Sequence, residues 1–547
     1  MMNFKNKIVV VFIAFLALFP KLVLSQKENE NFKLKYAQAW IVFNDEDYRG
    51  ALRIYRELYK NNSSHAMLNF RMGQCYSELR MMDSALIYLK NAVELDTTIK
   101  KEANLLLGQA YQFNSEIDKA LEYYYKYKSK LSPKQAERDY VNTLIQQCLT
   151  AKELMANPVQ VKVENLGPSI NSTYTDASPS ITADGKTLIY TSRRPDNVGG
   201  KFDFNAECYY DDIYISKWDD QKQDWAPSKN IGAPINTDFH DANMSISPDG
   251  NTIFIYKNIE GITQSGDIYF STKSPTGEWS EPKPILNKLI NSSYFESSAC
   301  ITADGNTMFF VSEREKEGYG HGDIYMVKKE GNNWGIPVNL GPSINTPYDE
   351  IGVYIHPDGK TLFFSSNGHK TMGGHDIFMS YFENGKWSEP INLGYPVNTP
   401  REEIHFVLST DKRTAYISSN REGSIGNYDI FKVDMTNYFK TNKDIPTNVS
   451  LAITGSTLTI MKGKVSDAND SKPIKAVLTF KDVIDNKTYV TESNENGEYF
   501  ITLPSDKRYE VSTKADGYKA FTLKFKVPRN DELETPSLVK HFLLNKE

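Results

Sequence analysis

A repeated stretch decides the fold: DGNTMFF at residues 304–310, followed by GDIYM at residues 322–326. The Asp-Gly turn leads into an apolar strand, and a second strand begins at the Asp-Ile-Tyr element. The turn recurs at spacings of 65, 55, 54 and 53 residues. The turns are Asp184-Gly185, Asp249-Gly250, Asp304-Gly305, Asp358-Gly359 and the decayed Asp411-Lys412.

Two further strand signals complete each copy. The second strands start at Asp212, Asp267, Asp323, Asp376 and Asp429, and outer strands carry Trp225, Trp279, Trp334 and Trp387. Four short strands per copy predict the blades of a β-propeller over residues 158–437. The last copy has no tryptophan strand, whereas residues 159–170 contain Asn165-Leu166-Gly167. We therefore expect this N-terminal strand to close the ring.

The recurring Ser-Pro-Asp-Gly and Gly-Asp-Ile-Tyr signatures resemble the WD40-like (PD40) repeats of TolB-type propellers. The resemblance covers about half of the chain and implies a fold rather than an activity. The repeats give five blades, and six remain open because six are common in propellers of this type.

A helical repeat precedes the propeller, over residues 31–156. Ala51, Ala85 and Ala120 recur at spacings of 34 and 35, which is the length of a tetratricopeptide repeat. Gly73 and Gly108 each stand 12 residues before such an alanine, where small residues let two helices approach closely. We therefore expect an all-α solenoid that binds protein. Its candidate groove residues, for which packing is the favoured role, are Tyr123, Tyr124, Tyr125 and Tyr127.

Alternating strands with Gly and Pro punctuation follow a predicted linker at residues 438–456. The order of Gly463-Lys464-Val465, Pro473-Ile474, Asn496-Gly497 and Gly517-Tyr518 resembles the carboxypeptidase-regulatory-like domain. This resemblance implies a small transthyretin-like β-sandwich over residues 457–545. It transfers no catalytic residue.

The N-terminus predicts export. Lys5 and Lys7 precede an apolar run from Ile8 to Phe19, so residues 1–25 have the form of a cleaved signal peptide. The alternative, a membrane anchor, is disfavoured because the run is shorter than the ~20 residues that span a bilayer. We expect a periplasmic protein, possible association with the outer membrane, and no membrane span after cleavage.

The net charge and the pattern of cysteines exclude several functional classes of protein. A net charge of -6 on 547 residues argues against nucleic acid as a partner. The four cysteines show no CxxC pairing, so buried free thiols are favoured over a disulfide pair and no zinc site is expected. No nucleophile elbow, Walker loop or His-Glu-x-x-His occurs. We therefore expect no enzyme and no cofactor or metal.

One aligned position is acidic in every copy of the propeller repeat and is called here the acidic column. Its members are Asp176, Asp241, Glu296, Glu350 and Glu403. Each stands just before the first strand of its blade, so we expect five carboxylates around the channel mouth on one face. Loops on that face carry Arg193, Arg314 and Arg421, together with His321 and His375.

Two interpretations of the acidic column remain open. Either the loop arginines and backbone N–H groups pair with it and weld the blades together, which is favoured, or the mouth binds a cation or a basic segment. The histidines are expected to form loop hydrogen bonds. The first copy also contains an inserted loop with Phe204 and Cys208, for which a ligand contact and tolerated extra length are equally open.

The order of the domains resembles a family of multidomain periplasmic proteins that usually end in an OmpA-like domain, one of them a type IX secretion component. This sequence ends at Glu547, directly after the β-sandwich, so the resemblance does not extend to the OmpA-like domain. It implies a non-catalytic scaffold for secretion or envelope assembly, held by envelope or outer-membrane proteins as partners. The alternative function is a propeller that binds peptide, glycan or cation, or a vestigial hydrolase.

Overall fold

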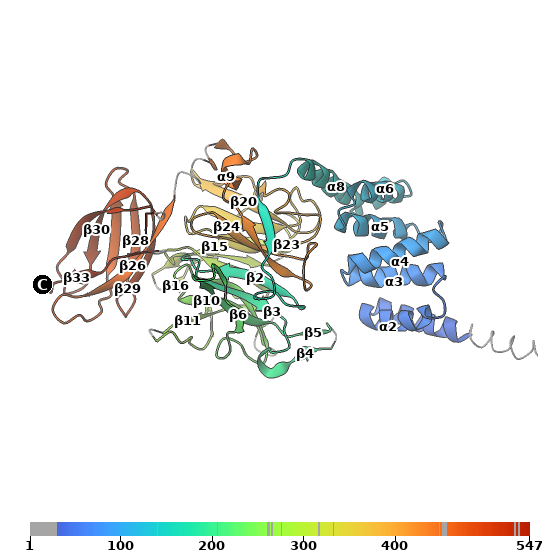
Figure 1. The fold of residues 1–547 in the computed structure, drawn as a ribbon, viewed down its shortest axis with the longest axis horizontal. Coiled ribbons are helices and arrows are strands. Elements are labelled where there is room, and N and C mark those ends of the chain that lie inside the picture. Colours follow the sequence, from blue (N-terminus) through green and yellow to red (C-terminus); the bar gives the residue numbers. More distant parts are fainter. Residues whose placement is uncertain are drawn as a thin grey trace, which may run out of the picture. The chain divides into compact units, whose positions relative to one another are not determined.

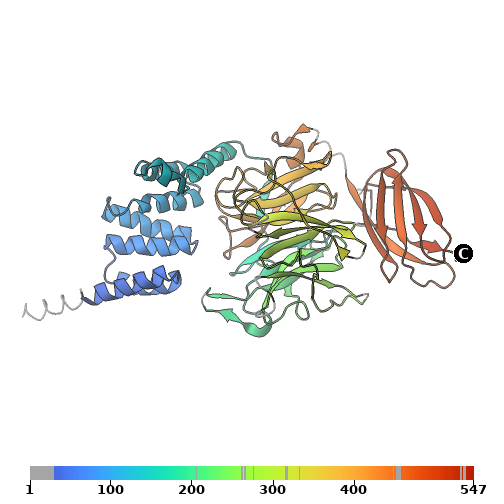
Figure 2. The same cartoon turned by 180° about the vertical axis from the view of Figure 1, so that it is seen from behind.

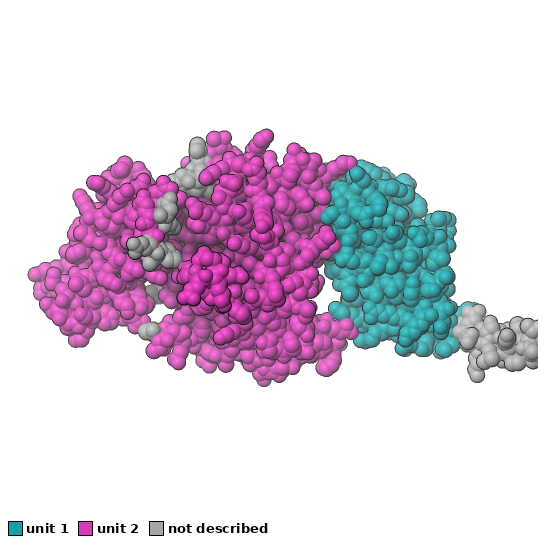
Figure 3. All heavy atoms as spheres, viewed as in Figure 1, with its two compact units in different colours: residues 1–148 teal, residues 149–547 magenta. Residues whose placement is uncertain are grey.

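The computed structural model describes residues 30–547 except positions 139, 205, 260–262, 264–265, 275, 315–317, 332, 448, 451–456, 530–531 and 534–536. The chain forms two compact units, Met1–Cys148 and Leu149–Glu547, which Figure 3 colours separately. The predicted signal peptide lies outside the described residues. Within the described part of the chain, no helix combines the length and the apolar character that a membrane span needs.

The first unit is a stack of antiparallel helices, which Figure 1 and, from behind, Figure 2 both show. Helical residues 30–44 come first. The next helices are α2 (Tyr48–Tyr59), α3 (Ala66–Glu78), α4 (Met82–Leu95), α5 (Glu102–Phe113), α6 (Ile117–Lys128), α7 (Pro133–Arg138) and α8 (Val141–Ala156), the last of which runs across the boundary between the units. The expectation of an N-terminal helical region followed by a β-rich region is thus confirmed.

The small residues of the helical repeat stand where paired helices touch. A Cβ atom on Gly73 would lie 2.6 Å from Cγ of Leu89 on the facing helix α4. A Cβ atom on Gly108 would lie 2.5 Å from Cδ1 of Tyr124 on α6. Tyr124 is fully buried and its hydroxyl donates to Oε1 of Gln112 over 2.7 Å. The repeat spacing therefore reflects close packing of each helix pair.

The four groove candidates divide between packing and surface. Tyr124 and Tyr127 are buried in the helical unit. Tyr123 stacks on Tyr111 with 5.4 Å between the ring centroids, and Tyr125 is exposed. Packing thus accounts for most of this tyrosine run.

The second unit contains five antiparallel sheets in sequence order. Sheet one has β2 (Asp176–Ile181), β3 (Thr187–Ser192), β6 (Asp212–Asp219), β7 (Asp224–Trp225) and β8 (Lys229–Asn230). Sheet two has β9 (His240–Ile246), β10 (Thr252–Asn258), β11 (Asp267–Thr272) and β12 (Lys283–Pro284). Sheet three has β13 (Glu296–Ile301), β14 (Thr307–Ser312), β15 (Asp323–Glu330), β16 (Asn333–Trp334) and β17 (Val338–Asn339).

Sheets four and five repeat this order. Sheet four has β18 (Glu350–Ile355), β19 (Thr361–Ser366), β20 (Asp376–Glu383), β21 (Lys386–Trp387) and β22 (Ile391–Asn392). Sheet five has β23 (Glu403–Leu408), β24 (Thr414–Ser419) and β25 (Asp429–Asp434), and its outer strand is β1 (Lys162–Asn165). Between β3 and β6, a separate short hairpin of β4 (Phe202–Asp203) and β5 (Cys208–Tyr209) follows a 3-10 turn at Val198–Gly200.

The first strands of the five sheets form a closed cycle. Strand β2 contacts β9, β9 contacts β13, β13 contacts β18, β18 contacts β23, and β23 contacts β2 again. Strand β1 pairs antiparallel with β25, joining the beginning of this region to its end. Apolar side chains of neighbouring sheets pack between them, as in the cluster that joins Phe363 of sheet four to Phe406 of sheet five. We call this arrangement the five-sheet ring.

The predicted linker is partly incorporated into the core of the ring. Helix α9 (Tyr438–Thr441) places Tyr438 and Phe439 in the same buried cluster as sheets four and five, and Ile445 and Val449 join it. The interpretation of residues 438–456 as linker was therefore wrong for Tyr438, Phe439, Ile445 and Val449, whose side chains bury apolar surface. Residues 451–456 lie outside the described part.

The C-terminal region consists of two sheets that share one hydrophobic core. One sheet contains β26 (Leu458–Asp467), β29 (Glu498–Pro504), β32 (Leu538–Val539) and β33 (Phe542–Leu544). The other contains β27 (Val477–Asp482), β28 (Thr488–Glu492), β30 (Lys507–Lys514) and β31 (Phe521–Val527). Val465 and Tyr499 from the first sheet meet Phe480 and Val511 from the second in this core.

Candidate functional site

The acidic column lies inside the five-sheet ring. Each member stands at the beginning of the first strand of its sheet, and all five side chains are fully buried. Their place around the channel mouth on one face stays a prediction, and their burial favours internal pairing over an exposed ring of charges. They are buried because the sequence supplies hydrogen-bond donors for them from the preceding link and from the second strand.

In the segment that links each sheet to the next, a Ser or Thr four residues before the acid supplies hydrogen-bond donors. Thr346 donates to Glu350 from its backbone N–H over 2.7 Å and from its hydroxyl over 2.8 Å. The hydroxyl of Ser366 on the second strand adds a bond of 2.6 Å. Equivalent bonds from the link reach the other four acids from Ser172, Thr237, Ser292 and Thr399.

Four of the five acids also have a cation beside them, which is buried in three cases and partly buried in the fourth. Arg421 pairs with Glu403 over 3.0 Å, and Arg314 lies 3.7 Å from Glu296. Lys257 contacts Asp241 in sheet two. These basic groups offset part of the cost of burying each carboxylate.

The arginine of sheet one is Arg194 rather than the expected Arg193. Arg194 pairs with Asp176 over 2.9 Å, whereas Arg193 pairs with Asp211 over 2.7 Å and is 40% exposed. Arg194 follows Ser192 by two residues, as Arg314 follows Ser312. The position relative to the strand end therefore selects the residue that reaches inside.

Sheet four has no cation at this place among the described residues. Gly368 stands two residues after Ser366, and a Cβ there would lie 1.9 Å from Oγ1 of Thr346. His369 instead makes a 2.8 Å hydrogen bond from Nε2 to the carbonyl of Ile344. Burial raises the pKa of Glu350 to about 7, and repulsion from Asp323 adds to the effect, although hydrogen bonds from Ser366 and Thr346 oppose it.

A second row of carboxylates lies beside the acidic column. Its members start the third strand of each sheet, which is the Asp-Ile strand of the sequence repeat, and we call it the strand-start row. Its members are Asp212, Asp267, Asp323, Asp376 and Asp429. The sequence identified these residues only as strand beginnings. Electrostatic repulsion acts between Asp376 and Glu403 and between Asp323 and Glu350. Because the two members of each pair belong to adjacent sheets, the two rows lie next to each other across the sheet boundaries.

Asparagines in the short outer strands donate hydrogen bonds to four members of the strand-start row. Asn392 donates to Asp376 over 2.6 Å, and Asn165, Asn230 and Asn339 make the same bond in their own sheets. Burial raises the pKa of Asp212 to about 6 and that of Asp376 well above its ordinary range. Asp212 and Asp376 thus bind a proton more tightly in the folded protein than in the unfolded chain.

Sequence reasoning also missed the asparagine that precedes each link Ser or Thr. The Asn345 side chain accepts from the backbone N–H of Ile324 over 2.8 Å and donates to its carbonyl over 3.0 Å. Its neighbour Thr346 meanwhile bonds Glu350 of the following sheet. The signal was present as a repeated motif: INS at 170–172, INT at 235–237, INS at 290–292, INT at 344–346 and VNT at 397–399.

The two candidate histidines lie at separate sheet boundaries. His375 bonds Oε2 of Glu402 through Nδ1 over 2.9 Å. His321 donates its backbone N–H to the carbonyl of Tyr348 over 3.0 Å. The backbone N–H of Glu403 donates to the carbonyl of His375 over 2.9 Å, but within the described residues neither histidine ring bonds a carboxylate of the acidic column. That part of the chain also contains no group of three His, Cys, Asp or Glu side chains arranged to hold a metal ion.

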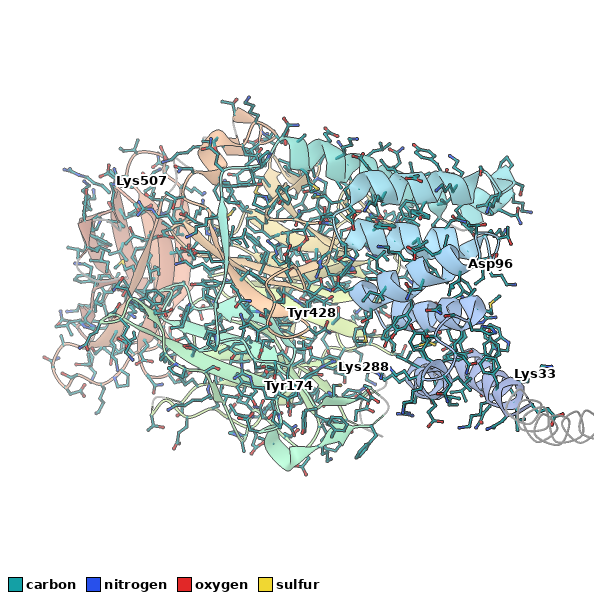
Figure 4. The ribbon with its side chains drawn as sticks, turned by 45° about the vertical axis from the view of Figure 1, so that its right-hand side comes forward. Lys33, Asp96, Tyr174, Lys288, Tyr428 and Lys507 are labelled. Atoms are coloured by element: carbon teal, nitrogen blue, oxygen red, sulfur yellow. The ribbon has the colours of Figure 1, made fainter. Side chains whose placement is uncertain are left out.

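The inserted loop of the first copy forms the β4–β5 hairpin with an aromatic cluster. The Phe202 ring lies 5.3 Å from Phe204 and 5.0 Å from Tyr209, and Tyr209 lies 5.7 Å from Tyr174. Figure 4 labels Tyr174 among the side chains. The cysteine of this hairpin, Cys208, is a half-buried free thiol, and the other three cysteines are free and buried.

Comparison with known proteins gives fold similarity alone. No protein-family model and no curated protein matches the chain. The type III secretion chaperone SycD of Yersinia enterocolitica, solved with a peptide of the translocator YopD, is 12% identical over 22% of this chain and 95% of its own, with a TM-score of 0.21.

PcrH in complex with the chaperone binding region of PopD is 14% identical over 23% of this chain and 95% of its own, with a TM-score of 0.21. The helical N-terminal region resembles these chaperones. A 3-chlorocatechol 1,2-dioxygenase of Rhodococcus opacus is 13% identical over 16% of this chain and 60% of its own, with a TM-score of 0.14. Scores this low carry no argument about function.

Proposed function

We propose that the protein is a non-catalytic scaffold of the bacterial envelope, exported to the periplasm by its N-terminal signal and bound there to secretion or surface-assembly proteins. In this proposal the helical unit is a tetratricopeptide solenoid, the five-sheet ring is a five-bladed TolB-type propeller and the C-terminal sheets are a transthyretin-like β-sandwich. A type IX secretion system is the specific setting that the domain order suggests.

The observation that carries the proposal is the internal use of the acidic column. These carboxylates are the residues best suited to chemistry in the repeat, yet their oxygens accept hydrogen bonds from link hydroxyls and second-strand serines. The link asparagine bonds one sheet while the adjacent Ser or Thr bonds the acid of the next. The arrangement supports a role for the column as a weld between sheets, which leaves outer surfaces for protein contacts.

Crosslinking in intact cells of the source organism tests the scaffold. The tagged full chain is expected to recover the same few envelope proteins in repeated purifications, identified by mass spectrometry. An unrelated exported protein carrying the same tag is the control. Recovery of no envelope protein above that control would contradict the proposal.

A thermal-shift screen separates the scaffold from a propeller that binds small ligands. Ca²⁺, sugars and short basic peptides are added to the purified chain. A ligand at 100 times its Kd would stabilise the folded state by about 2.7 kcal/mol, which is readily measured. We expect no shift with any of these ligands, and a saturable shift would favour the ligand-binding function instead.

A further inference from the structure

Two neighbouring loops at the outer edge of sheet three carry exposed aliphatic side chains. The Asn287 side chain donates to the carbonyls of Trp334 and Gly335, over 2.9 Å in each case. These bonds hold residues 286–289 beside residues 334–336. Leu286 is 92% exposed and Ile336 is 73% exposed, although large apolar side chains normally avoid water.

Leu289 on the first loop and Val338, which begins strand β17 directly after the second loop, are also exposed. We call the four side chains Leu286, Leu289, Ile336 and Val338 the aliphatic patch. Exposed apolar groups gathered in one place on a folded protein commonly mark an interaction surface.

The other sheets show that the fold does not require apolar residues at these positions. Val338 pairs with the third strand of its sheet as Lys229 does in sheet one and Lys283 does in sheet two. Ile336, two residues earlier, corresponds to Glu389 in sheet four. Sheet four has Ile391 at the Val338 position, whereas it has the charged Glu389 at the Ile336 position, so the fold of the ring does not require an apolar side chain at Ile336.

The patch carries a positive charge of its own. Lys288 stands between Leu286 and Leu289, is exposed, and forms no ion pair with any carboxylate of the described residues. Figure 4 labels its side chain. A partner that covers the leucines would bring its own groups close to this ammonium, and a carboxylate there would be favoured.

We propose that the aliphatic patch docks a segment of a partner protein that presents aliphatic side chains with a carboxylate facing Lys288. The inference rests on the scaffold function and assigns it a surface. A protein fits better than an anionic bilayer, because one lysine gives little attraction and the chain as a whole carries a net charge of -6.

A photo-reactive amino acid placed at position 336 of the full chain tests the surface in cells, with position 389 as the matched control in sheet four. We expect one partner protein to be crosslinked from position 336 and not from position 389. Ile336→Glu, which introduces the residue that sheet four already has, is expected to reduce recovery of that partner about tenfold or more. Ile484→Glu, at an exposed isoleucine in the C-terminal region, is expected to leave recovery unchanged.

Charge reversal tests the complementary carboxylate. Lys288→Glu is expected to lower the affinity for the purified partner several-fold, and more so at low salt. Equal adducts from both positions, or no adduct at all, would overturn the proposal. So would an adduct between two copies of this chain, or flotation with phosphatidylglycerol vesicles that Ile336→Glu abolishes. If every patch variant recovers the same partners in the same amounts as the native chain, the scaffold function is retained and the docking surface is rejected.

Discussion

Sheets five and four both bury a glutamate side chain, but among the residues that the structure describes only sheet five places a cation beside it. In sheet five, Glu403 is fully buried and Arg421 lies 3.0 Å from it. In sheet four, Glu350 is equally buried, but Gly368 stands where the arginine would be. Both acids accept the same bonds from a link threonine and a second-strand serine.

Comparison of these two sheets shows that the acid accepts the same hydrogen bonds in both, whereas, within the described part of the chain, a neighbouring cation is present in only one of them. Hydroxyl and backbone donors reach both carboxylate oxygens of Glu350 and Glu403, and Arg421 in addition opposes the rise that burial causes in the pKa of Glu403. Glu350, without a cation, has its pKa raised to about 7. Within the acidic column, Glu350 therefore exchanges its proton near neutral pH.

Removal of the cation from sheet five should give the largest effect. Arg421→Met leaves Glu403 buried and unpaired, and is expected to lower the free energy of unfolding by about 3–5 kcal/mol. Urea denaturation at pH 7 measures the loss. Arg413→Met, at an exposed arginine in the same sheet, is the control, and a similar loss in both variants would show that the pairing is unimportant.

Glu350→Gln should change how stability depends on pH. Because burial raises the pKa of Glu350 from 4.5 to about 7, the folded state binds the proton more tightly than the unfolded state. Stability from this group is full below pH 4.5 and is lost as pH rises to about 7, by roughly 3 kcal/mol.

The glutamine variant lacks this loss, so its stability relative to the native chain should rise between pH 5 and pH 8. Chemical denaturation at the two pH values measures the change. Glu389→Gln, at an exposed acid of the same sheet, serves as control. A parallel pH dependence in the native chain and the Glu350 variant would contradict the assignment.

Gly368→Ala tests why sheet four has no longer side chain at this place. The added Cβ would meet Oγ1 of Thr346, so the link must shift, at an expected cost of about 1–3 kcal/mol. Thermal unfolding measures the cost. Gly359→Ala is a poor control because its φ is positive, whereas Lys360→Ala on the exposed turn should be nearly neutral.

The adjacent arginines of sheet one should give the smallest effect and a direct contrast. Arg193→Met removes a pair with Asp211 that is partly exposed, so a loss of about 1 kcal/mol or less is expected. Arg194→Met, which unpairs the buried Asp176, should cost several times as much. Equal losses in urea denaturation would mean that burial does not distinguish the two pairs.

Much of the architecture could be predicted because it repeats. The Asp-Gly turns, the Asp-Ile strand starts and the closing strand β1 all follow from short-range signals that recur in register. In the helical region, Gly73 and Gly108 identify the places where helices touch. The four buried residues of the predicted linker were misjudged because nothing local distinguishes an exposed linker from a segment that finds a core to cover.

The candidate site was only half visible in the sequence. Alignment of the copies identified the acidic column, and chemistry required partners for it. Alignment alone did not show that Asp376 and Glu403, 27 positions apart, become neighbours across a sheet boundary. It also did not separate Arg193 from Arg194, because adjacent residues at a strand end differ only in the direction that the folded backbone gives them.

The sequence by itself determined the order of the regions, the repeat and the acid at one place in every copy, since these depend on local turn and strand preferences. Only the tertiary structure decided that the acids are buried, which cation each receives, and that Glu350 receives none. These outcomes depend on the closed ring, in which links and strands from neighbouring copies enclose the carboxylates and exclude water.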